Sequence, residues 1–268
     1  MTQGLASLPM YLANKDAVSA LWNLLRPRLQ AAGLSRLATD LTWPQDYHAH
    51  WLEGDLLLSQ SCGYPFTDDL AGKVQLVGCF AYDAPQCDGI RCASVLVARQ
   101  EHAHLKPHAF RGMRAAFNAP NSQSGYNAFR AWAAPMAVAG RFFASAIETG
   151  GHGASVQAVR TGLADLASID CVTYAALGRY TPQAVEGLCI VGTTPAYPGL
   201  PLITSNTTSG SDIASLQAAL RSVLASDGAV STLQALGIVG FETPSPAVYQ
   251  RCVAMRQFAQ TLGYPTLA

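Results

Sequence analysis

Two short polar segments carry the side chains of this sequence that are best suited to bind an anion. Residues 118–126 read Asn-Ala-Pro-Asn-Ser-Gln-Ser-Gly-Tyr and connect a predicted strand to a predicted helix. The first N–H groups of a helix lack acceptors within the helix, and the helix dipole makes that end positive. Ser122 and Ser124 add hydroxyl donors, and Gly125 lets an anion approach the backbone. The segment predicts an anion site, although Ser122 could equally act as an ordinary N-cap.

The second segment is Gly150-Gly151-His152-Gly153, which also lies between a predicted strand and a predicted helix. Glycines permit close approach of a ligand to the backbone, and a histidine can donate a hydrogen bond to an anion or titrate near neutral pH. A flexible turn with a solvated histidine is the alternative. Asp170 ends a later predicted strand, where it could accept a hydrogen bond from a ligand or cap the next helix.

Nucleophilic chemistry has weaker support. Cys171, His152 and Asp170 are the residue types of Cys–His catalysis, and Cys62 is another candidate nucleophile. Their spacing in the sequence does not bring them together, and buried structural cysteine is common. We therefore expect a protein that is not an enzyme and has no catalytic residue.

Metal and nucleotide chemistry are also weakly supported. His102, His104 and His108 form one short histidine pattern, and His48 and His50 form another, both in polar stretches without neighbouring carboxylates or thiols. We interpret them as surface histidines and expect no metal site. Neither a Walker-type loop nor a GxGxxG motif is present, so we expect no cofactor.

Strand-like and helix-like segments alternate along the chain, which indicates an α/β architecture with mostly parallel sheets. Such sheets bind ligands at the carboxyl ends of their strands, where both anion-binding segments fall. Asn14 can cap the first helix, and Pro27 should kink or break it near Asn23. We expect strands over residues 5–12, 37–43, 55–59, 74–80, 94–99, 114–117, 142–147, 166–169 and 188–192, and helices over residues 15–32, 45–52, 122–139, 154–161, 172–180, 211–226 and 246–262.

Composition excludes several classes of protein. The 268 residues include 17 Lys+Arg and 17 Asp+Glu, and charged residues make up 13%, about half the usual share. With 50% hydrophobic residues and no net charge, the chain does not fit the composition of a disordered protein. It has no basic cluster for nucleic acid or for a membrane surface, and no apolar run of membrane-spanning length.

The N-terminus and the cysteines bear on the compartment. The apolar stretch at residues 5–12 is short, is interrupted by Ser7 and Pro9, and precedes the first basic residue, so it does not resemble a signal peptide. We expect a periplasmic protein if a signal peptide has been removed, and a cytoplasmic one otherwise. The seven scattered cysteines form no CxxC motif and favour reduced thiols over a disulfide framework.

Several motifs in order resemble the phosphate/phosphonate-type substrate-binding proteins of ABC transporters, the PhnD-like family. The resemblance covers residues 5–224. Residues 122–126, Ser-Gln-Ser-Gly-Tyr, look like the family's Ser-x-Ser-Gly-Tyr anion-binding turn, and residues 150–152 look like its Gly-Gly-His turn. Residues 162–170 match the family's G-x-A-D-x-A-x-x-D stretch, and residues 197–201 resemble its proline-rich return loop.

The resemblance implies a type 2 periplasmic-binding fold, in which two α/β lobes face each other across a cleft and two crossings act as hinges. Lobe one would comprise residues 1–93 plus 195–268, and lobe two residues 94–194. The crossings would lie near residues 94–98 and 190–194.

The resemblance also implies binding without chemistry, with a small oxyanion as ligand and an ABC permease as partner. The oxyanion would lie on Ser122, Ser124 and Gly125, and closure would follow from contacts that both lobes make only in the closed state. We expect ligand contacts from ten residues in all: Tyr11, Ser61, Tyr64, Arg91, Ser122, Ser124, Gly125, Tyr126, His152 and Asp170.

Two departures from the family pattern qualify this interpretation. Residues 91–94 lack the tyrosines that phosphonate binders place at the first crossing, and Gly199 replaces the acid of the return loop. An aminoalkyl phosphonate is therefore disfavoured, and Arg91 could pair with a second anionic group. The alternatives are a cytoplasmic ligand sensor, an enzyme of the same fold that resembles thiamine-pyrimidine synthases, and an interaction domain without a small ligand.

Overall fold

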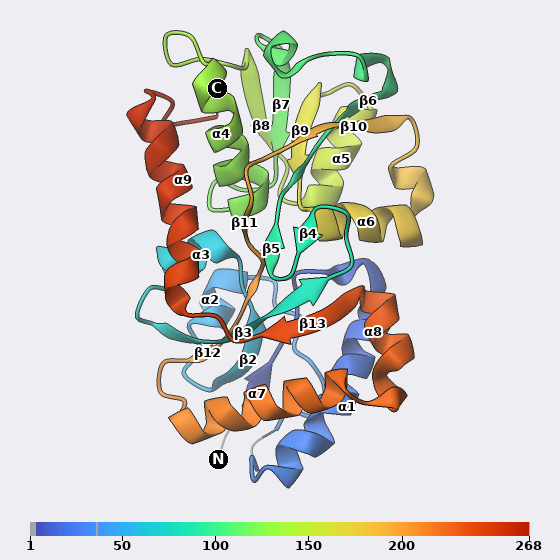
Figure 1. Cartoon of the computed structure of the whole chain (residues 1–268), viewed down its shortest axis with the longest axis vertical. Coiled ribbons are helices and arrows are strands. Elements are labelled where there is room, and N and C mark those ends of the chain that lie inside the picture. Colours follow the sequence, from blue (N-terminus) through green and yellow to red (C-terminus); the bar gives the residue numbers. More distant parts are fainter. Residues whose placement is uncertain (1–3, 36, 268) are drawn as a thin grey trace. The chain divides into compact units, whose positions relative to one another are not determined.

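The chain forms two units, each assembled from separate stretches of sequence (Figure 1). A computed structural model describes residues 4–35 and 37–267. Unit 1 comprises the residues up to Asp83 together with Gly199–Val248, and unit 2 comprises Ala84–Pro198 together with the residues from Tyr249 onward. The chain therefore passes between the units three times.

Unit 1 is built on a five-stranded sheet of order β1-β2-β12-β3-β13. Its β1 and β2 are parallel, whereas β12 runs antiparallel to both of its neighbours, β2 and β3. The central strands are apolar and buried, as their sequences predict. The strands span Leu5–Ala6 (β1), Leu56–Gln60 (β2), Val74–Tyr82 (β3), Pro201–Ser205 (β12) and Ile238–Glu242 (β13).

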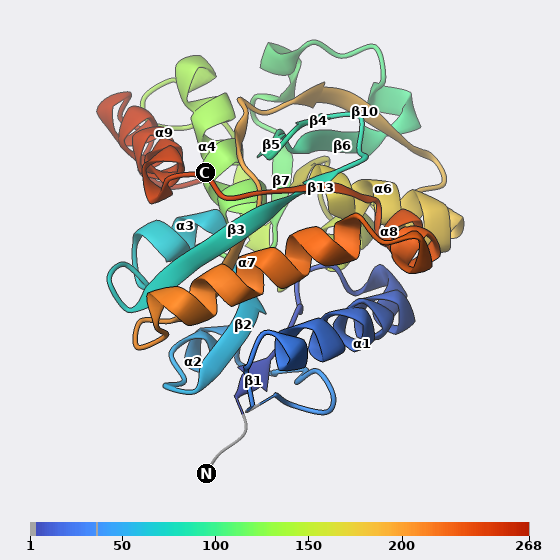
Figure 2. The ribbon, with the colours of Figure 1, turned by 60° about the horizontal axis from the view of Figure 1, so that its bottom comes forward.

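Helices α1 and α7 of unit 1 pack against each other, and α7 also packs on β3 and β13 (Figure 2). The side chain of Asn14 accepts a hydrogen bond from the N–H of Ala17, which confirms the predicted N-cap of α1. The helices of unit 1 are α1 (Lys15–Ala31), α2 (Tyr47–Trp51), α3 (Gly63–Thr67), α7 (Gly210–Leu224) and α8 (Val230–Leu236), with 3-10 turns at Leu12–Asn14 and Asp227–Ala229.

Of the predicted kink or break of α1 at Pro27, the break is wrong, because the helix is continuous from Lys15 to Ala31. Proline removes the hydrogen bond to the carbonyl of the residue four positions earlier, which here is Asn23. Both Pro27 and Asn23 are exposed, so water can take up that carbonyl. The opposite face, which includes Leu25 and Leu29, is fully buried and holds the helix in place.

Unit 2 has a five-stranded sheet of order β10-β6-β9-β7-β8 and a small sheet of order β11-β5-β4. In the larger sheet, β9, β7 and β8 are parallel, and β6 runs antiparallel to β9 and β10. The strands span Cys87–Asp88 (β4), Arg91–Cys92 (β5), Val95–Arg99 (β6), Arg114–Phe117 (β7), Ser145–Glu148 (β8), Leu166–Ile169 (β9), Leu188–Thr193 (β10) and Tyr197–Pro198 (β11).

The helices of unit 2 cover its sheet. Figure 1 shows α4 and α9 side by side, and α5 packs on β6, β7 and β9. The helices are α4 (Ala128–Ala133), α5 (His152–Arg160), α6 (Cys171–Tyr180) and α9 (Gln250–Thr261). A π-helix at Gln123–Asn127 leads into α4, and 3-10 turns lie at Gln100–His102, Pro107–Phe110, Ala134–Met136, Pro182–Ala184 and Pro246–Tyr249.

Both larger sheets are mixed, whereas the sequence predicted mostly parallel pairing. Strands joined by a helical crossover within one unit run parallel, as β7 and β8 do. Among the antiparallel strands, β13 takes the direction of β12, to which α7 and α8 connect it. β12 and β6 instead follow a passage of the chain from the other unit. No crossover helix sets their direction, which the alternation of strands and helices along the chain could not reveal.

The passages between units also differ from the expected crossings. They fall after Asp83, after Pro198 and after Val248. The segments that we expected to be crossings instead form β6 and β10, which pair with each other inside unit 2. The C-terminal helix α9, expected in lobe one, packs on α4, where the side chain of Asn127 donates a 2.8 Å hydrogen bond to the carbonyl of Cys252.

Three smaller expectations were wrong or incomplete. Residues 37–43 form a single bridge from Leu37 to Gly4 rather than a strand, and residues 7–12 leave the first strand early. Some elements were not predicted because they are short or bounded by glycine and proline: the β4–β5 hairpin, β12, α8 and β13. Among the described helices, none is both long and apolar enough to cross a membrane.

A cluster of charged side chains holds the edges of β6, β7 and β9 together in unit 2. Arg114 donates two side-chain hydrogen bonds to Asp165, at 3.0 and 2.8 Å, and Arg99 donates a third at 3.0 Å. The backbone N–H of Arg114 also donates to this carboxylate. Burial by itself would raise the pKa of Asp165, but the hydrogen bonds from Arg114 and Arg99 outweigh it and hold the pKa well below its usual value.

Replacing Asp165 with asparagine should lower the free energy of unfolding by about 2 kcal/mol at pH 7, because two guanidinium groups lose their anionic acceptor. A carboxylate whose folded pKa is depressed stabilises the protein above its unfolded pKa, near 4, and this contribution fades as the pH falls. Urea unfolding at pH 7 and pH 3 should therefore show a smaller difference between D165N and wild type at pH 3. The exposed Asp40 supplies the control, D40N. An equal difference at both pH values would contradict this account.

Candidate functional site

The predicted serine turn follows β7 and opens the helical segment that leads into α4. Ser122 is the N-cap residue: its backbone is extended and its hydroxyl oxygen accepts the N–H of Gly125 at 3.1 Å. The first turn is a π-helix, a rare form that is frequent at functional sites. Among the described residues, none accepts the N–H of Ser124. The end of the helix therefore offers at least one backbone donor to an outside group.

The carbonyl of Ser124 fixes the position of this turn. It accepts a 3.0 Å hydrogen bond from the hydroxyl of Ser94 and a 2.7 Å hydrogen bond from the hydroxyl of Ser168. Ser94 directly precedes β6, and Ser168 lies in β9. The first turn of the helix is thus bonded to two strands of the sheet. All three serines are buried, at 5% exposure or less.

His152 joins this turn from the start of α5. Its Nε2 lies 2.9 Å from the hydroxyl oxygen of Ser124, while its Nδ1 is buried and has no partner among the described residues. Burial lowers the pKa of His152 to about 4, so the ring is neutral at physiological pH. In the tautomer protonated at Nδ1, Nε2 accepts the hydroxyl proton of Ser124 and Nδ1–H remains a donor for a ligand.

Gly125 allows the turn to approach its neighbours closely. A Cβ at this position would overlap Oδ1 of Asn118 and lie 3.1 Å from Cε1 of His152. The Oδ1 atom of Asn118 is itself buried without a partner among the described residues. Two unsatisfied polar side chains therefore lie beside Gly125. Unsatisfied buried polar atoms are costly, so their presence here indicates a place where a ligand or water completes the hydrogen bonds.

The chemistry of this site is that of neutral donors. A backbone N–H, two hydroxyl groups and a neutral imidazole surround the beginning of a helix, whose dipole favours negative charge. None of these groups is a strong base or an activated nucleophile. The arrangement can donate hydrogen bonds to an oxyanion. It brings together Ser122, Ser124, Gly125 and His152, and their role as ligand contacts stays a prediction.

Other predicted ligand residues of unit 2 lie differently. Asp170 caps α6 by accepting the N–H of Thr173 at 2.9 Å, the alternative role considered from the sequence. The ring of Tyr126 packs on Phe117, and its hydroxyl accepts the N–H of Leu267, so its side chain serves the core. Arg91 is exposed on β5, and the structure records no polar contact of its side chain with the serine turn.

The three residues predicted in unit 1 lie near the carboxyl ends of β1, β2 and β3. Ser61 directly follows β2, is completely buried, and has a hydroxyl without a partner among the described residues. The ring of Tyr11 meets that of Tyr82 edge to face at 5.1 Å. Tyr64 is partly buried in α3. Among these three residues, Ser61 has a buried hydroxyl that needs a further hydrogen-bond partner.

The alternative chemistries considered from the sequence find little support. The sulfur of Cys171 lies 3.5 Å from that of Cys87, whereas His152 bonds to Ser124. The hydrogen bond with Cys87 and burial raise the pKa of Cys171 to about 12, the opposite of an activated nucleophile.

The histidines of the two sequence patterns contact different residues and do not converge on one point. His50 is buried and lies 2.7 Å from the hydroxyl of Ser7, and burial lowers its pKa. His48 lies 3.8 Å from Asp69, and His102 lies 3.7 Å from Glu101. These contacts are those of structural and surface histidines.

Sequence reasoning missed Ser94, Ser168, Asn118 and Thr149 as parts of the site. The hydroxyl of Thr149 donates to the carbonyl of Phe117 and lies 2.7 Å from that of Ser155, which connects the end of β7 to the start of α5. A signal was present for Asn118 and Thr149, because both are polar and directly follow a strand. Ser168 lies inside a buried strand, where a lone serine gives no such signal.

A separate cavity of about 320 Å³ lies in unit 1 between the start of β2 and the start of α7. Asp55 and Asp212 both line it. Two carboxylates repel an anion, so this cavity is not a candidate for the same ligand.

The fold and the site together define a class of protein. Two discontinuous α/β units with mixed sheets, one of which presents a serine turn and a Gly-Gly-His turn at its strand ends, are the features of a type 2 periplasmic-binding fold. The family model described as "ABC transporter, phosphonate, periplasmic substrate-binding protein" matches residues 55–249. The chain belongs to this family, which confirms the resemblance drawn from its motifs. No curated protein matches the chain in sequence.

Solved structures of low sequence identity share the fold over nearly the whole chain. PhnD1 from Prochlorococcus marinus in complex with methylphosphonate has a TM-score of 0.76 at 14% identity, covering 96% of this chain and 97% of that one. XAC2383 from Xanthomonas citri bound to ATP has a TM-score of 0.73 at 15% identity, with 97% and 98% covered. A binding protein component of an ABC phosphonate transporter (PA3383) from Pseudomonas aeruginosa has a TM-score of 0.71 at 16% identity, with 98% and 88% covered.

Gly125→Ala should destabilise the protein by about 1–3 kcal/mol, the usual range for overpacking, because the added methyl overlaps the side chain of Asn118. The cost should fall to below about 1 kcal/mol when Asn118 is replaced by alanine in the same chain. Gly153→Ala is the control, since a Cβ there meets nothing within 4 Å. Urea unfolding of wild type, G125A, N118A and the double variant measures the coupling energy between residues 118 and 125. If G125A costs as much in the N118A background as in wild type, the two residues do not clash as described.

The neutral His152 should make stability depend on pH. A histidine whose folded pKa is lowered binds its proton more weakly in the folded state, so protonation favours unfolding as the pH falls below about 6.5. Between pH 7 and pH 4, wild type should lose about 2 kcal/mol more than H152Q. The exposed His104 gives the control, H104Q, which should behave as wild type. Parallel stability curves for wild type and H152Q would show that His152 is not held neutral.

Proposed function

We propose that this protein is a non-catalytic solute-binding protein that captures a small oxyanion, of the phosphate or phosphonate kind, on the serine turn of unit 2. The observation that carries the proposal is the group around Ser124: an N–H without an acceptor, a hydroxyl bonded to His152, and the buried Nδ1 of that histidine without a partner among the described residues. A tetrahedral oxyanion presents several acceptor oxygens and could accept from the N–H of Ser124 and from the one proton that the Ser124–His152 pair leaves free, which lies on Nδ1 in one tautomer and on the hydroxyl in the other.

The physical basis for affinity is local hydrogen bonding rather than net charge. Lysine and arginine are absent from the serine turn and from the Gly-Gly-His turn, and the chain as a whole carries no net charge. Hydrogen bonds between neutral donors and a charged acceptor are stronger than neutral pairs, and a buried setting strengthens them further. Membership of the phosphonate-binding family supports the same ligand class.

Binding without chemistry follows from the same residues. A catalytic acid or base needs a pKa near the operating pH, whereas His152 has a pKa of about 4 and Cys171 one of about 12. We therefore assign no catalytic residue. The contacts of these groups position a ligand and do not activate it.

Unit 1 would supply the remaining ligand contacts. We assign these to Ser61, with its buried hydroxyl, and to Tyr11 and Tyr64. Arg91 would pair with a second anionic group on ligands that carry one. A ligand that gains contacts with both units only in a closed state shifts the protein toward that state. Delivery to an ABC permease and a periplasmic location follow from the family description, and we propose both for this chain.

Isothermal titration of the full chain with phosphate, methylphosphonate, sulfate and adipate would test the proposal. We expect phosphate or methylphosphonate to bind, and Ser124→Ala to weaken binding by about tenfold to a hundredfold, because it removes the hydroxyl that together with His152 provides one charge-assisted hydrogen bond to the ligand. This variant removes the hydroxyl and leaves the carbonyl that anchors the turn.

Ser231→Ala, an exposed serine on α8, is the matched control and should bind as wild type does. If none of the phosphorus oxyanions binds, or if S124A binds them as tightly as wild type, the proposal fails. If adipate binds more tightly than the phosphorus oxyanions, the ligand class is that of dicarboxylates and not that of phosphate and phosphonates.

A further inference from the structure

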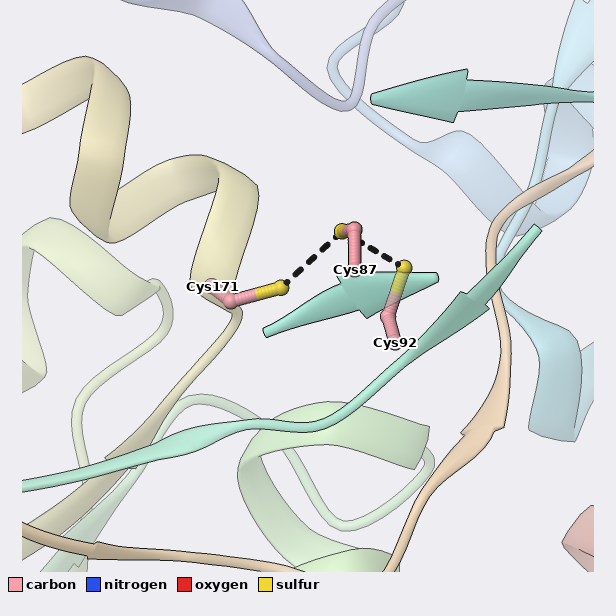
Figure 3. A group of neighbouring side chains, drawn as sticks. All are labelled: Cys87, Cys92 and Cys171. Carbon is pink, nitrogen blue, oxygen red and sulfur yellow. Dashed lines mark hydrogen bonds between the residues drawn. The ribbon is translucent and has the colours of Figure 1, made fainter. Parts of the chain in front are cut away.

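Three cysteines of unit 2 that are far apart in the sequence converge on one point. Figure 3 shows Cys87 and Cys92 on the adjacent strands β4 and β5, with Cys171 facing them from the first turn of α6. The sulfur of Cys87 lies 3.1 Å from that of Cys92 and 3.5 Å from that of Cys171. All three sulfur atoms lie within 4.8 Å of one another.

The backbone around the cluster holds the three thiols in place. Cys87 and Cys92 are direct register partners in the β4–β5 hairpin, and Cys92 also pairs with Tyr197 of β11. Asp170 caps the helix that begins with Cys171. Each thiol is thus fixed by a hydrogen-bonded strand or a capped helix, which is the preorganisation that a coordination site requires.

We propose that Cys87, Cys92 and Cys171 form a coordination site for a thiophilic d10 cation, Cu(I) or Zn²⁺, separate from the oxyanion site. Thiolates are the ligands that select these soft metals. Cu(I) accepts three thiolates without a fourth ligand. Zn²⁺ with three protein ligands keeps a fourth position for water, and the partly exposed Cys87 leaves a side of the cluster open to solvent.

The distances between sulfur atoms suit this role after a small adjustment. With metal–sulfur bonds of about 2.3 Å, the sulfur atoms around a metal lie about 3.8 Å apart. The separations of 3.1 and 3.5 Å therefore need to lengthen by about 0.7 and 0.3 Å. Among the described histidine, cysteine, aspartate and glutamate residues, these three form the group whose ligand atoms come this close together.

The electrostatics of the cluster call for a cation. Three thiolates whose sulfur atoms lie within 4.8 Å of one another would repel one another. A bound cation removes this repulsion, and up to three protons leave the thiols as the metal–sulfur bonds form. The N-terminal end of α6, at Cys171, adds a favourable dipole for the resulting negative charge.

A disulfide between Cys87 and Cys92 is the competing explanation. Cysteines opposite each other on antiparallel strands can be joined by one. A disulfide would use only the sulfur atoms of Cys87 and Cys92. It would not explain why the sulfur of Cys171 also lies beside that of Cys87. The two explanations differ in the number of thiols that remain after isolation and in the effect of removing Cys171.

The test uses the full chain, reduced and kept without oxygen. Competition with a coloured Cu(I) chelator and, separately, with a coloured Zn²⁺ chelator measures the affinity for each metal. We expect one metal ion per chain, tighter binding at higher pH, and at least a hundredfold loss of affinity in Cys87→Ser and in Cys171→Ser. Cys189→Ser is the matched control: this partly buried thiol of unit 2 hydrogen-bonds to backbone carbonyls, and its replacement should leave the affinity unchanged.

The two single variants protect the test against misfolding, because Cys87 is partly exposed whereas Cys171 is buried. X-ray absorption should show three sulfur ligands for the metal that binds. Stoichiometric binding that survives both C87S and C171S would overturn the proposal. So would reduced wild type that binds neither metal. A Cys87–Cys92 disulfide in the isolated protein, with no metal bound after its reduction, would establish the competing explanation. Oxyanion titrations do not enter this test, so the proposed function can fail independently.

Discussion

The candidate site depends on one backbone carbonyl, that of Ser124, which accepts hydrogen bonds from two buried serine hydroxyls. Ser94 reaches it from the segment before β6, and Ser168 reaches it from β9. These bonds hold the first turn of the helical segment against the sheet and so determine where its N–H groups and the Ser124 hydroxyl lie. Because the groups are buried, a shift of the turn would leave the carbonyl of Ser124 and the hydroxyl of Ser168 without these hydrogen bonds, whereas Ser94 would keep its contact with the hydroxyl of Tyr197, and this cost opposes movement of the turn.

Rigid neutral donors resolve an apparent contradiction in a protein of balanced charge that belongs to a family of anion-binding proteins. A lysine or arginine site attracts anions of many shapes from a distance. A turn made of a backbone N–H, hydroxyl groups and a neutral imidazole acts only at contact, and its strength comes from geometry in a buried setting. Burial keeps His152 neutral, and the hydroxyl of Ser124 fixes the orientation of its ring. The charged cluster around Asp165 in unit 2 serves a different purpose: Arg99 and Arg114 neutralise Asp165 and join three strand edges.

The motifs allowed much of the fold and part of the site to be predicted. Residues 122–126 and 150–152 indicated both turns, because their polar side chains and glycines fall at the junction of a strand and a helix, where local sequence has a direct structural meaning. Asn14 indicated the start of α1 for the same reason. Direction within the sheets and the location of α9 could not be predicted in this way, because each depends on contacts between segments far apart in the chain. The β4–β5 hairpin is local, but its strands have only two residues each, too few to show an alternating pattern.

The sequence by itself determined the α/β class, the positions of the serine turn and the Gly-Gly-His turn, and the absence of a lysine and arginine cluster along the chain, since propensity, capping and charge are properties of local residues. Only the tertiary structure decided that Ser94 and Ser168 anchor the turn, that Tyr126 and Asp170 have structural contacts, and that three scattered cysteines meet. A hydrogen bond such as that from Ser94 to the carbonyl of Ser124, or the approach of Cys171 to Cys87, exists only once the sheet has brought distant segments together. Neither contact can be predicted from the spacing of residues along the chain.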